Sequence, residues 1–123
     1  MYLSILFHIY SGFLFTQVCY NPDMAKLKPD YINNLTVKLG LINTFLTGPW
    51  VAGANMTYVD FLAYEFLDHI RRFVPDSFKE MGNVNSFMNR FEALPGMRKW
   101  FDSDVYKAGA YIHGPMAAWN GKD

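Results

Sequence analysis

The sequence predicts an all-α fold, a helical bundle of about five helices. In several segments apolar residues recur at three- and four-residue spacing, which places them on one face of a helix. No segment alternates apolar and polar residues long enough to indicate a β-strand. Breaks at Pro22, Pro49, Pro75 and Pro95 separate the helical segments, and neither a repeat nor a linker divides the chain.

The composition supports a core and excludes one kind of partner. The chain has 123 residues, about one domain, of which 51% are hydrophobic and 18% aromatic. Each buried aromatic ring removes about 150–250 Å² from water, so this composition requires many facing surfaces. The 11 basic and 11 acidic residues balance. Because binding to a nucleic-acid backbone normally requires a basic excess, we expect no nucleic-acid partner.

The first twenty residues carry no formal charge, and three interpretations compete. A secretory signal needs a basic start and small residues at a cleavage site, and this segment has neither. A membrane anchor needs roughly 20 predominantly apolar residues with flanking anchors, whereas Ser11-Gly12 interrupts this segment and the first basic residue is Lys26. We favour a helix that packs on the rest of the domain or on a partner absent from this chain, and expect no membrane association.

The second helix is expected to follow the Asn21-Pro22-Asp23 break. The residue before a proline is pushed out of the α region, so the first helix ends near Tyr20. Pro29 suits the first turn of the next helix, where its missing N–H costs nothing. Apolar residues keep helical spacing over residues 31–46, and Gly48-Pro49 ends the helix.

The segment 58–73 is the most informative helix. Residues 57–60 match a capping box, in which the Thr57 hydroxyl accepts from a backbone N–H and the Asp60 carboxylate accepts from the Thr57 N–H. The segment is apolar almost all round, as is typical of the buried centre of a bundle. Arg71 and Arg72 are expected to form a solvated helix end, stabilised by the helix dipole.

The remaining segments are shorter. Pro75 ends the long apolar helix, and an amphipathic helix from Val84 to Leu94 ends at Pro95. A short last helix covers residues 97–101. Residues 102–123 are expected to form an irregular tail packed by its aromatic side chains.

Spacing alone indicates neither a metal nor another cofactor. The histidines at 8, 69 and 113 lie in no ligand motif, and Cys19, the one cysteine, cannot form an internal disulfide or anchor a zinc site. A nucleophilic Cys19 would need a paired histidine and an electropositive site, and we can place neither.

Several short segments carry more than helical spacing. In order they are Cys19-Tyr20-Asn21-Pro22-Asp23, Lys26-Leu27-Lys28-Pro29-Asp30-Tyr31, Pro49-Trp50-Val51-Ala52-Gly53, Thr57-Tyr58-Val59-Asp60-Phe61-Leu62-Ala63-Tyr64, Arg90-Phe91-Glu92-Ala93-Leu94 and Ala118-Trp119-Asn120. The series resembles the C-terminal helical domain of mu-class glutathione S-transferases. The resemblance divides the chain into an apolar N-terminal segment unrelated to the family (1–17) and a glutathione S-transferase C-terminal-like helical domain (18–123).

The resemblance implies a transferase of glutathione metabolism and detoxification. In that family a thioredoxin-like N-terminal domain builds most of the glutathione site, and the thiolate attacks an apolar electrophile held between the two domains. A family carboxylate that contacts glutathione in the neighbouring subunit is replaced here by Tyr10. We therefore expect this chain to supply only the hydrophobic-substrate half and to be inactive alone, with glutathione as co-substrate in the family. The family also implies a cytoplasmic dimer.

Tyr20 is the one site residue that the resemblance transfers, as a substrate-binding residue. The matching tyrosine lies at the mouth of the hydrophobic substrate site, where its hydroxyl can donate to the substrate as charge develops. The alternative is a helix-end tyrosine packed against the Pro22 turn. No catalytic residue is transferred. The alternative function is a non-enzymatic helical module that binds a partner or an apolar ligand.

Overall fold

The computed structural model describes residues 18–108 and 116–119. The helices, in chain order, are α3 (Met24–Phe45), α4 (Tyr58–Phe73), the 3-10 helix η1 (Pro75–Phe78), α5 (Gly82–Glu92), α6 (Pro95–Phe101) and α7 (Asp104–Lys107). Within these described ranges the only β-type pairing is a bridge between Trp50 and Gly53. The prediction of an all-α fold with about five helices is confirmed. The interpretations of the segment 1–17 lie outside the described residues.

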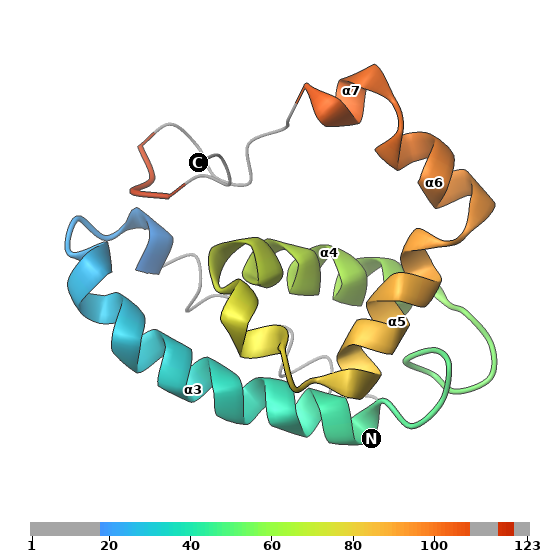
Figure 1. Cartoon of the computed structure of the whole chain (residues 1–123), viewed down its shortest axis with the longest axis horizontal. Helices are drawn as coiled ribbons and strands as arrows, with labels where there is room; N and C mark the ends of the chain where they lie inside the picture. Colours follow the sequence, from blue (N-terminus) through green and yellow to red (C-terminus); the bar gives the residue numbers. More distant parts are fainter. Residues whose placement is uncertain (1–17, 109–115, 120–123) are drawn as a thin grey trace.

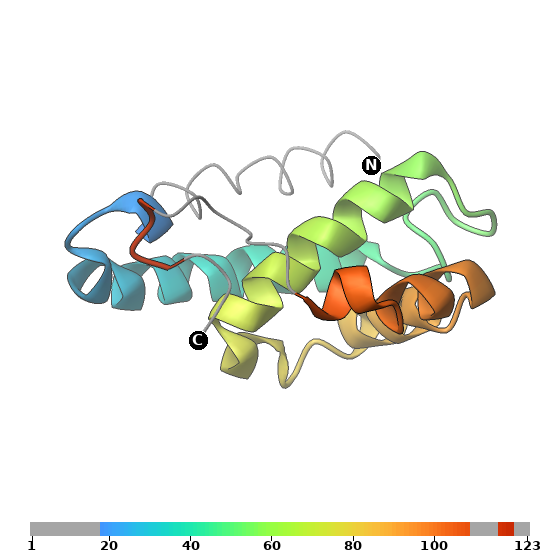
Figure 2. The same cartoon turned by 90° about the horizontal axis from the view of Figure 1, so that it is seen from above.

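Helix α4 lies between α3 and the α6–α7 side of the molecule in the view of Figure 1. The longest helix, α3, runs along one side of the molecule, and α4 crosses it obliquely (Figures 1 and 2). η1 turns back from the end of α4, and α6 and α7 lie on the other side of α4 from α3 in the view of Figure 1. Residues 116–119 return to the start of α3 (Figure 1). The two ends of the described chain therefore meet beside one another.

Three helices supply most of the core. Their buried side chains recur at the three- and four-residue spacing that the sequence shows. The buried apolar residues are Leu35, Leu39 and Ile42 of α3, Val59, Ala63, Tyr64, Leu67, Ile70 and Phe73 of α4, and Val84, Phe87, Met88 and Phe91 of α5.

The start of α3 differs from the expectation. The helix begins at Met24, so Pro29 lies inside it and not in its first turn. The proline removes the hydrogen bond to the Ala25 carbonyl. Because Ala25 and Pro29 are both exposed, water can reach the freed carbonyl.

Residues 102–123 are not irregular from their start, because Asp104–Lys107 form the short helix α7. The Ser103 hydroxyl caps this helix by accepting from the Tyr106 N–H at 3.2 Å. The Tyr106 ring packs against Phe101 with ring centroids 5.0 Å apart. A helix of four residues is too short to show a period, which is why the spacing could not reveal it.

The first turn of α5 is capped by another helix. Its own N-cap, Met81, makes no side-chain bond. Instead the Asn43 side chain, from α3, accepts from the backbone N–H groups of Asn83 at 2.8 Å and Val84 at 3.1 Å. The Asn83 side chain donates in return to the Asn43 carbonyl. This exchange satisfies exposed helix-end donors and fixes α5 against α3.

The capping box at the start of α4 is confirmed. Both halves are present, and the Asp60 carboxylate accepts from the Thr57 N–H at 2.8 Å. The other carboxylate oxygen accepts from the Val51 N–H, also at 2.8 Å. Asp60 is fully buried. It therefore joins the start of α4 to the loop that precedes it.

Replacing Thr57 by alanine is expected to lower the free energy of unfolding by about 1 kcal/mol, because the substitution removes one half of the capping box. Urea unfolding followed by circular dichroism measures this change. Thr57→Ser keeps the hydroxyl and is expected to stay near the unsubstituted chain. An unchanged stability in Thr57→Ala would contradict the capping role.

Helix α4 is less buried than its composition predicted. In its second half only Arg72 is exposed, but near its start Tyr58 is 74%, Phe61 45% and Leu62 49% exposed. One face of this helix therefore carries an apolar surface at its N-terminal end, which we call the α4 apolar face (Tyr58, Phe61 and Leu62). The expectation of a helix buried all round is wrong for this face.

Candidate functional site

Tyr20 closes a helical turn over residues 18–20. The turn ends there because Pro22 has no N–H and the Asp23 N–H is held by the Asn21 side chain at 2.8 Å. The Asn21 N–H instead donates to the Val18 carbonyl at 3.2 Å. Tyr20 is 41% exposed. At this exposure part of the Tyr20 side chain is accessible from solvent.

Cys19, next to Tyr20, is fully buried and is the only cysteine of the chain. Burial raises the pKa of its thiol to about 12, against the opposing effect of the Lys28 charge. At neutral pH the side chain is therefore a thiol and not a thiolate. The thiolate, and not the thiol, is the nucleophile in cysteine chemistry.

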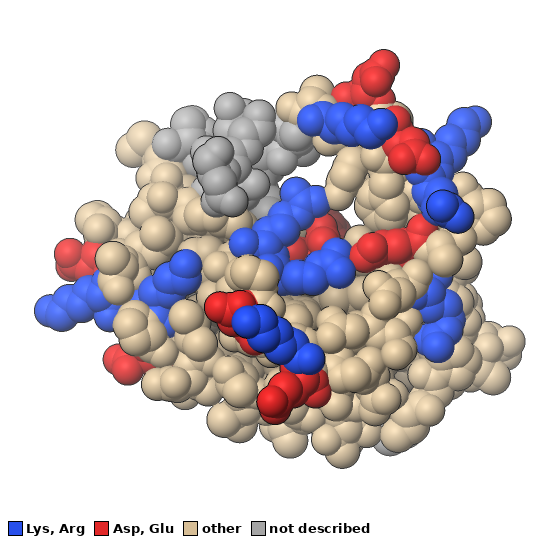
Figure 3. Space-filling view, in the orientation of Figure 1, with Lys and Arg blue, Asp and Glu red and all other residues tan. Residues whose placement is uncertain are grey.

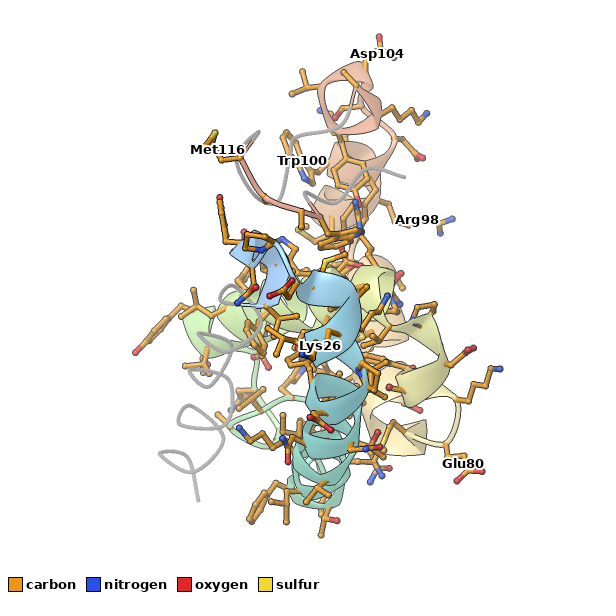
Figure 4. All side chains as sticks on the ribbon, turned by 90° about the vertical axis from the view of Figure 1, so that its left-hand side faces the viewer. Lys26, Glu80, Arg98, Trp100, Asp104 and Met116 are labelled. Carbon is orange, nitrogen blue, oxygen red and sulfur yellow. The ribbon has the colours of Figure 1, made fainter. Side chains whose placement is uncertain are left out.

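The C-terminal tail reaches the same turn. The backbone N–H groups of Ala118 and Trp119 both donate to the Cys19 carbonyl, at 2.7 and 3.3 Å. The Trp119 ring lies 4.9 Å from the ring of Phe73, the last residue of α4. Met116, in contrast, points away from the helices and is 88% exposed (Figure 4). Sequence reasoning did not find this contact, since residues so far apart in the chain leave no local pattern.

The arginines at the end of α4 are not a simple solvated helix end. Arg71 pairs with Asp68 at 2.8 Å and with Glu92 at 3.0 Å. Arg72 pairs with the other oxygen of Asp68 at 3.2 Å and donates to the Tyr106 hydroxyl. The expectation that Arg71 and Arg72 form a simple solvated helix end is therefore wrong. The spacing of Asp68 to both arginines could have indicated the pairs within the helix, but not those to Glu92 and Tyr106.

This cluster offers no excess charge to an ionic ligand. Burial alone lowers the pKa of Arg71, but the hydrogen bonds to Asp68 and Glu92 outweigh it and raise the pKa. The two arginines face two carboxylates, Asp68 and Glu92, so the formal charges of the cluster balance. On the face shown in Figure 3, basic and acidic side chains lie next to one another. We assign this cluster a structural role, in which it ties α4 to α5 and α7.

The described residues show no metal site and no membrane span. No three histidine, cysteine or acidic side chains gather closely enough there to hold a metal ion. No helix within the described ranges has both the length and the apolar character to cross a membrane.

The described residues form an all-α helical domain in which Tyr20 is exposed at a helix end. The family model "Glutathione S-transferase, C-terminal domain" matches residues 12–104. The chain therefore belongs to the glutathione S-transferase family.

Its relatives include mu-class enzymes. It is 41% identical over 113 residues to "Glutathione S-transferase 2" of Gallus gallus, covering 88% of this chain and 49% of that protein. It is 41% identical over 107 residues to "Glutathione S-transferase Mu 5" of Homo sapiens, covering 86% and 49%. The crystal structure of the glutathione S-transferase Blo t 8 superposes with a TM-score of 0.78 at 31% identity, covering 95% of this chain and 56% of that one. The chain thus spans about half the length of the relatives that it matches.

Proposed function

We propose that this chain supplies the hydrophobic-substrate half of a mu-class-like glutathione transferase and that Tyr20 binds the electrophile. One observation carries the proposal: the residue that matches the family's substrate tyrosine lies exposed at a helix end. Glutathione is the co-substrate, and the thioredoxin-like half that binds it comes from outside these residues. We further propose that the protein acts in the cytoplasm as a dimer.

The chemistry of a phenol defines its role. A hydroxyl that donates to an oxygen gaining negative charge stabilises the transition state more than the ground state. In the attack of a thiolate on an enone, the carbonyl oxygen gains that charge. In attack on a dinitrophenyl halide, the charge spreads over the nitro-substituted ring. Loss of the Tyr20 hydroxyl should therefore slow the enone reaction more.

A fused enzyme tests this proposal. Residues 18–123 joined to the N-terminal half of a mu-class relative should conjugate glutathione to 4-phenyl-3-buten-2-one, while the 123-residue chain alone should stay at the uncatalysed rate. Tyr20→Phe should lower kcat/KM for the enone by about 10- to 100-fold, the worth of one hydrogen bond to a developing charge.

The aryl halide provides the internal control. The Tyr20→Phe fused enzyme should lose much less of its rate with 1-chloro-2,4-dinitrobenzene. Equal losses with both substrates would contradict the donor role of Tyr20. Measurable conjugation by the 123-residue chain alone would overturn the proposal that this chain supplies only the hydrophobic-substrate half.

The α4 apolar face favours a second candidate, a module that binds a partner without catalysis. Exposed apolar groups clustered on one face are typical of interaction surfaces. Size-exclusion chromatography of the chain with an intact mu-class subunit tests this function. Co-elution together with an inactive fused enzyme would favour the module over the transferase.

A further inference from the structure

The helical turn 18–20 has a carbonyl that its own helix cannot satisfy. A helical carbonyl normally accepts from the N–H four residues later, which for Cys19 is that of Asp23. The Asp23 N–H donates instead to the Asn21 side chain at 2.8 Å. The two tail N–H groups at 118 and 119 occupy the Cys19 carbonyl in its place, at 2.7 and 3.3 Å. The tail thus completes the end of this turn.

The side chain of Trp119 holds the tail in that position. Its ring packs on the Phe73 ring at a centroid distance of 4.9 Å. Phe73 packs in turn on Tyr31 of α3, at 5.9 Å, and the Lys28 ammonium lies 4.4 Å from the centre of the Phe73 ring. Phe73 is buried. The tail is therefore anchored on a cluster that already joins α3 to the end of α4.

We propose that Ala118 and Trp119 form a C-terminal clasp and that Trp119 is a positioning residue for Tyr20. Tyr20 directly follows the residue whose carbonyl the clasp holds, so the clasp fixes the backbone from which the phenol extends. The expected effect of Trp119 on substrate binding by Tyr20 rests on the proposed function. The clasp does not rest on it, so the clasp and the effect on substrate can be tested separately.

Cys19 is a reporter within the chain for the clasp. It is the only thiol, it is fully buried, and its own carbonyl accepts the two hydrogen bonds. In the 123-residue chain, Trp119→Ala should raise the rate of reaction with 5,5′-dithiobis(2-nitrobenzoic acid) at least about tenfold, because a turn whose Cys19 carbonyl is released should open locally and expose the buried thiol. Met116→Ala alters an exposed side chain of the same tail segment and should leave the rate unchanged.

A second variant separates the clasp from loss of the fold. Ala118→Pro removes the shorter hydrogen bond while leaving the Trp119 ring, and it should also raise the thiol rate. Local opening predicts a rate that depends weakly on urea, whereas global unfolding predicts a strong dependence. An unchanged thiol rate in both variants, or a rate that follows global unfolding only, would overturn the clasp.

The position of Tyr20 is measured directly. In the chain with ¹³C-labelled tyrosine rings, the Tyr20 signal, assigned by its absence in Tyr20→Phe, should shift in Trp119→Ala and not in Met116→Ala. A faster thiol reaction with an unmoved Tyr20 signal would overturn the positioning role.

The fused enzyme then tests the consequence for substrate. Trp119→Ala should lower the ratio of enone to aryl halide rates towards that of Tyr20→Phe, and the double variant should lower it no further. Additive losses would overturn the link from Trp119 to substrate. An inactive parent fused enzyme would instead refute the proposed function, while the thiol and tyrosine measurements would still decide the clasp.

Discussion

Replacing Asp60 by alanine is expected to lower the free energy of unfolding by about 3–5 kcal/mol. The carboxylate is fully buried and accepts from the backbone N–H groups of Val51 and Thr57, each at 2.8 Å. The substitution leaves both donors without this acceptor, and a buried unsatisfied donor costs about 1–3 kcal/mol. Urea unfolding of the 123-residue chain measures the loss.

Two variants that should each cost less than Asp60→Ala serve as comparisons. Asp60→Asn keeps one oxygen acceptor and should cost less than Asp60→Ala. Thr57→Ala removes the other half of the box and should cost only about 1 kcal/mol. If Asp60→Ala cost no more than Thr57→Ala, the bond to Val51 would contribute nothing, and the carboxylate would be a cap alone.

The Val51 bond matters because it fixes the loop between α3 and α4. In this loop Trp50 and Gly53 exchange two backbone hydrogen bonds, both at 3.0 Å. Gly53 has φ near 120°, a conformation that favours glycine. Arg90 of α5 donates to the Pro49 carbonyl at 2.7 Å. Asp60 therefore ties the loop to the start of α4, and Arg90 ties the same loop to α5. Loss of the Asp60 carboxylate should loosen the loop as well as the helix start.

Local signals account for what the sequence could predict. The capping box depends on residues three apart, and the core faces of α3, α4 and α5 depend on helical spacing, so both could be read from the chain. The cap of α5 by Asn43 and the pairing of Arg71 with Glu92 join residues distant in sequence, and no local pattern encodes them.

The candidate site likewise contains one feature that the sequence could predict and one that it could not. Tyr20 was identified from a motif shared with a family, because neither its spacing nor its chemistry singles it out. The tail contact that holds the neighbouring carbonyl of Cys19 joins opposite ends of the chain and needed the structure. The motif therefore identifies a candidate residue, and the fold shows what fixes its backbone.

Replacing Phe91 by alanine is expected to cost about 3–5 kcal/mol, the usual range for a buried phenylalanine. Phe91 is 1% exposed. Its ring stacks on Tyr64 with centroids 4.3 Å apart and makes a T-shaped contact with Phe61 at 5.1 Å. A cavity at this position would remove both contacts and separate α5 from α4. Thermal and urea unfolding should both show this loss of stability. A cost below about 1.5 kcal/mol would contradict the prediction and mean that the site collapses to fill the cavity.

Phe61→Ala is the matched control, because it removes the same kind of ring from the other side of this contact. Phe61 is 45% exposed, so its loss removes less buried area and should cost clearly less than Phe91→Ala in the isolated chain. In the fused enzyme the α4 apolar face should gain cover from the added half. If it does, Phe61→Ala will destabilise the fused enzyme more than the chain alone, whereas equal losses in both would show that this face stays open to solvent in the assembled protein.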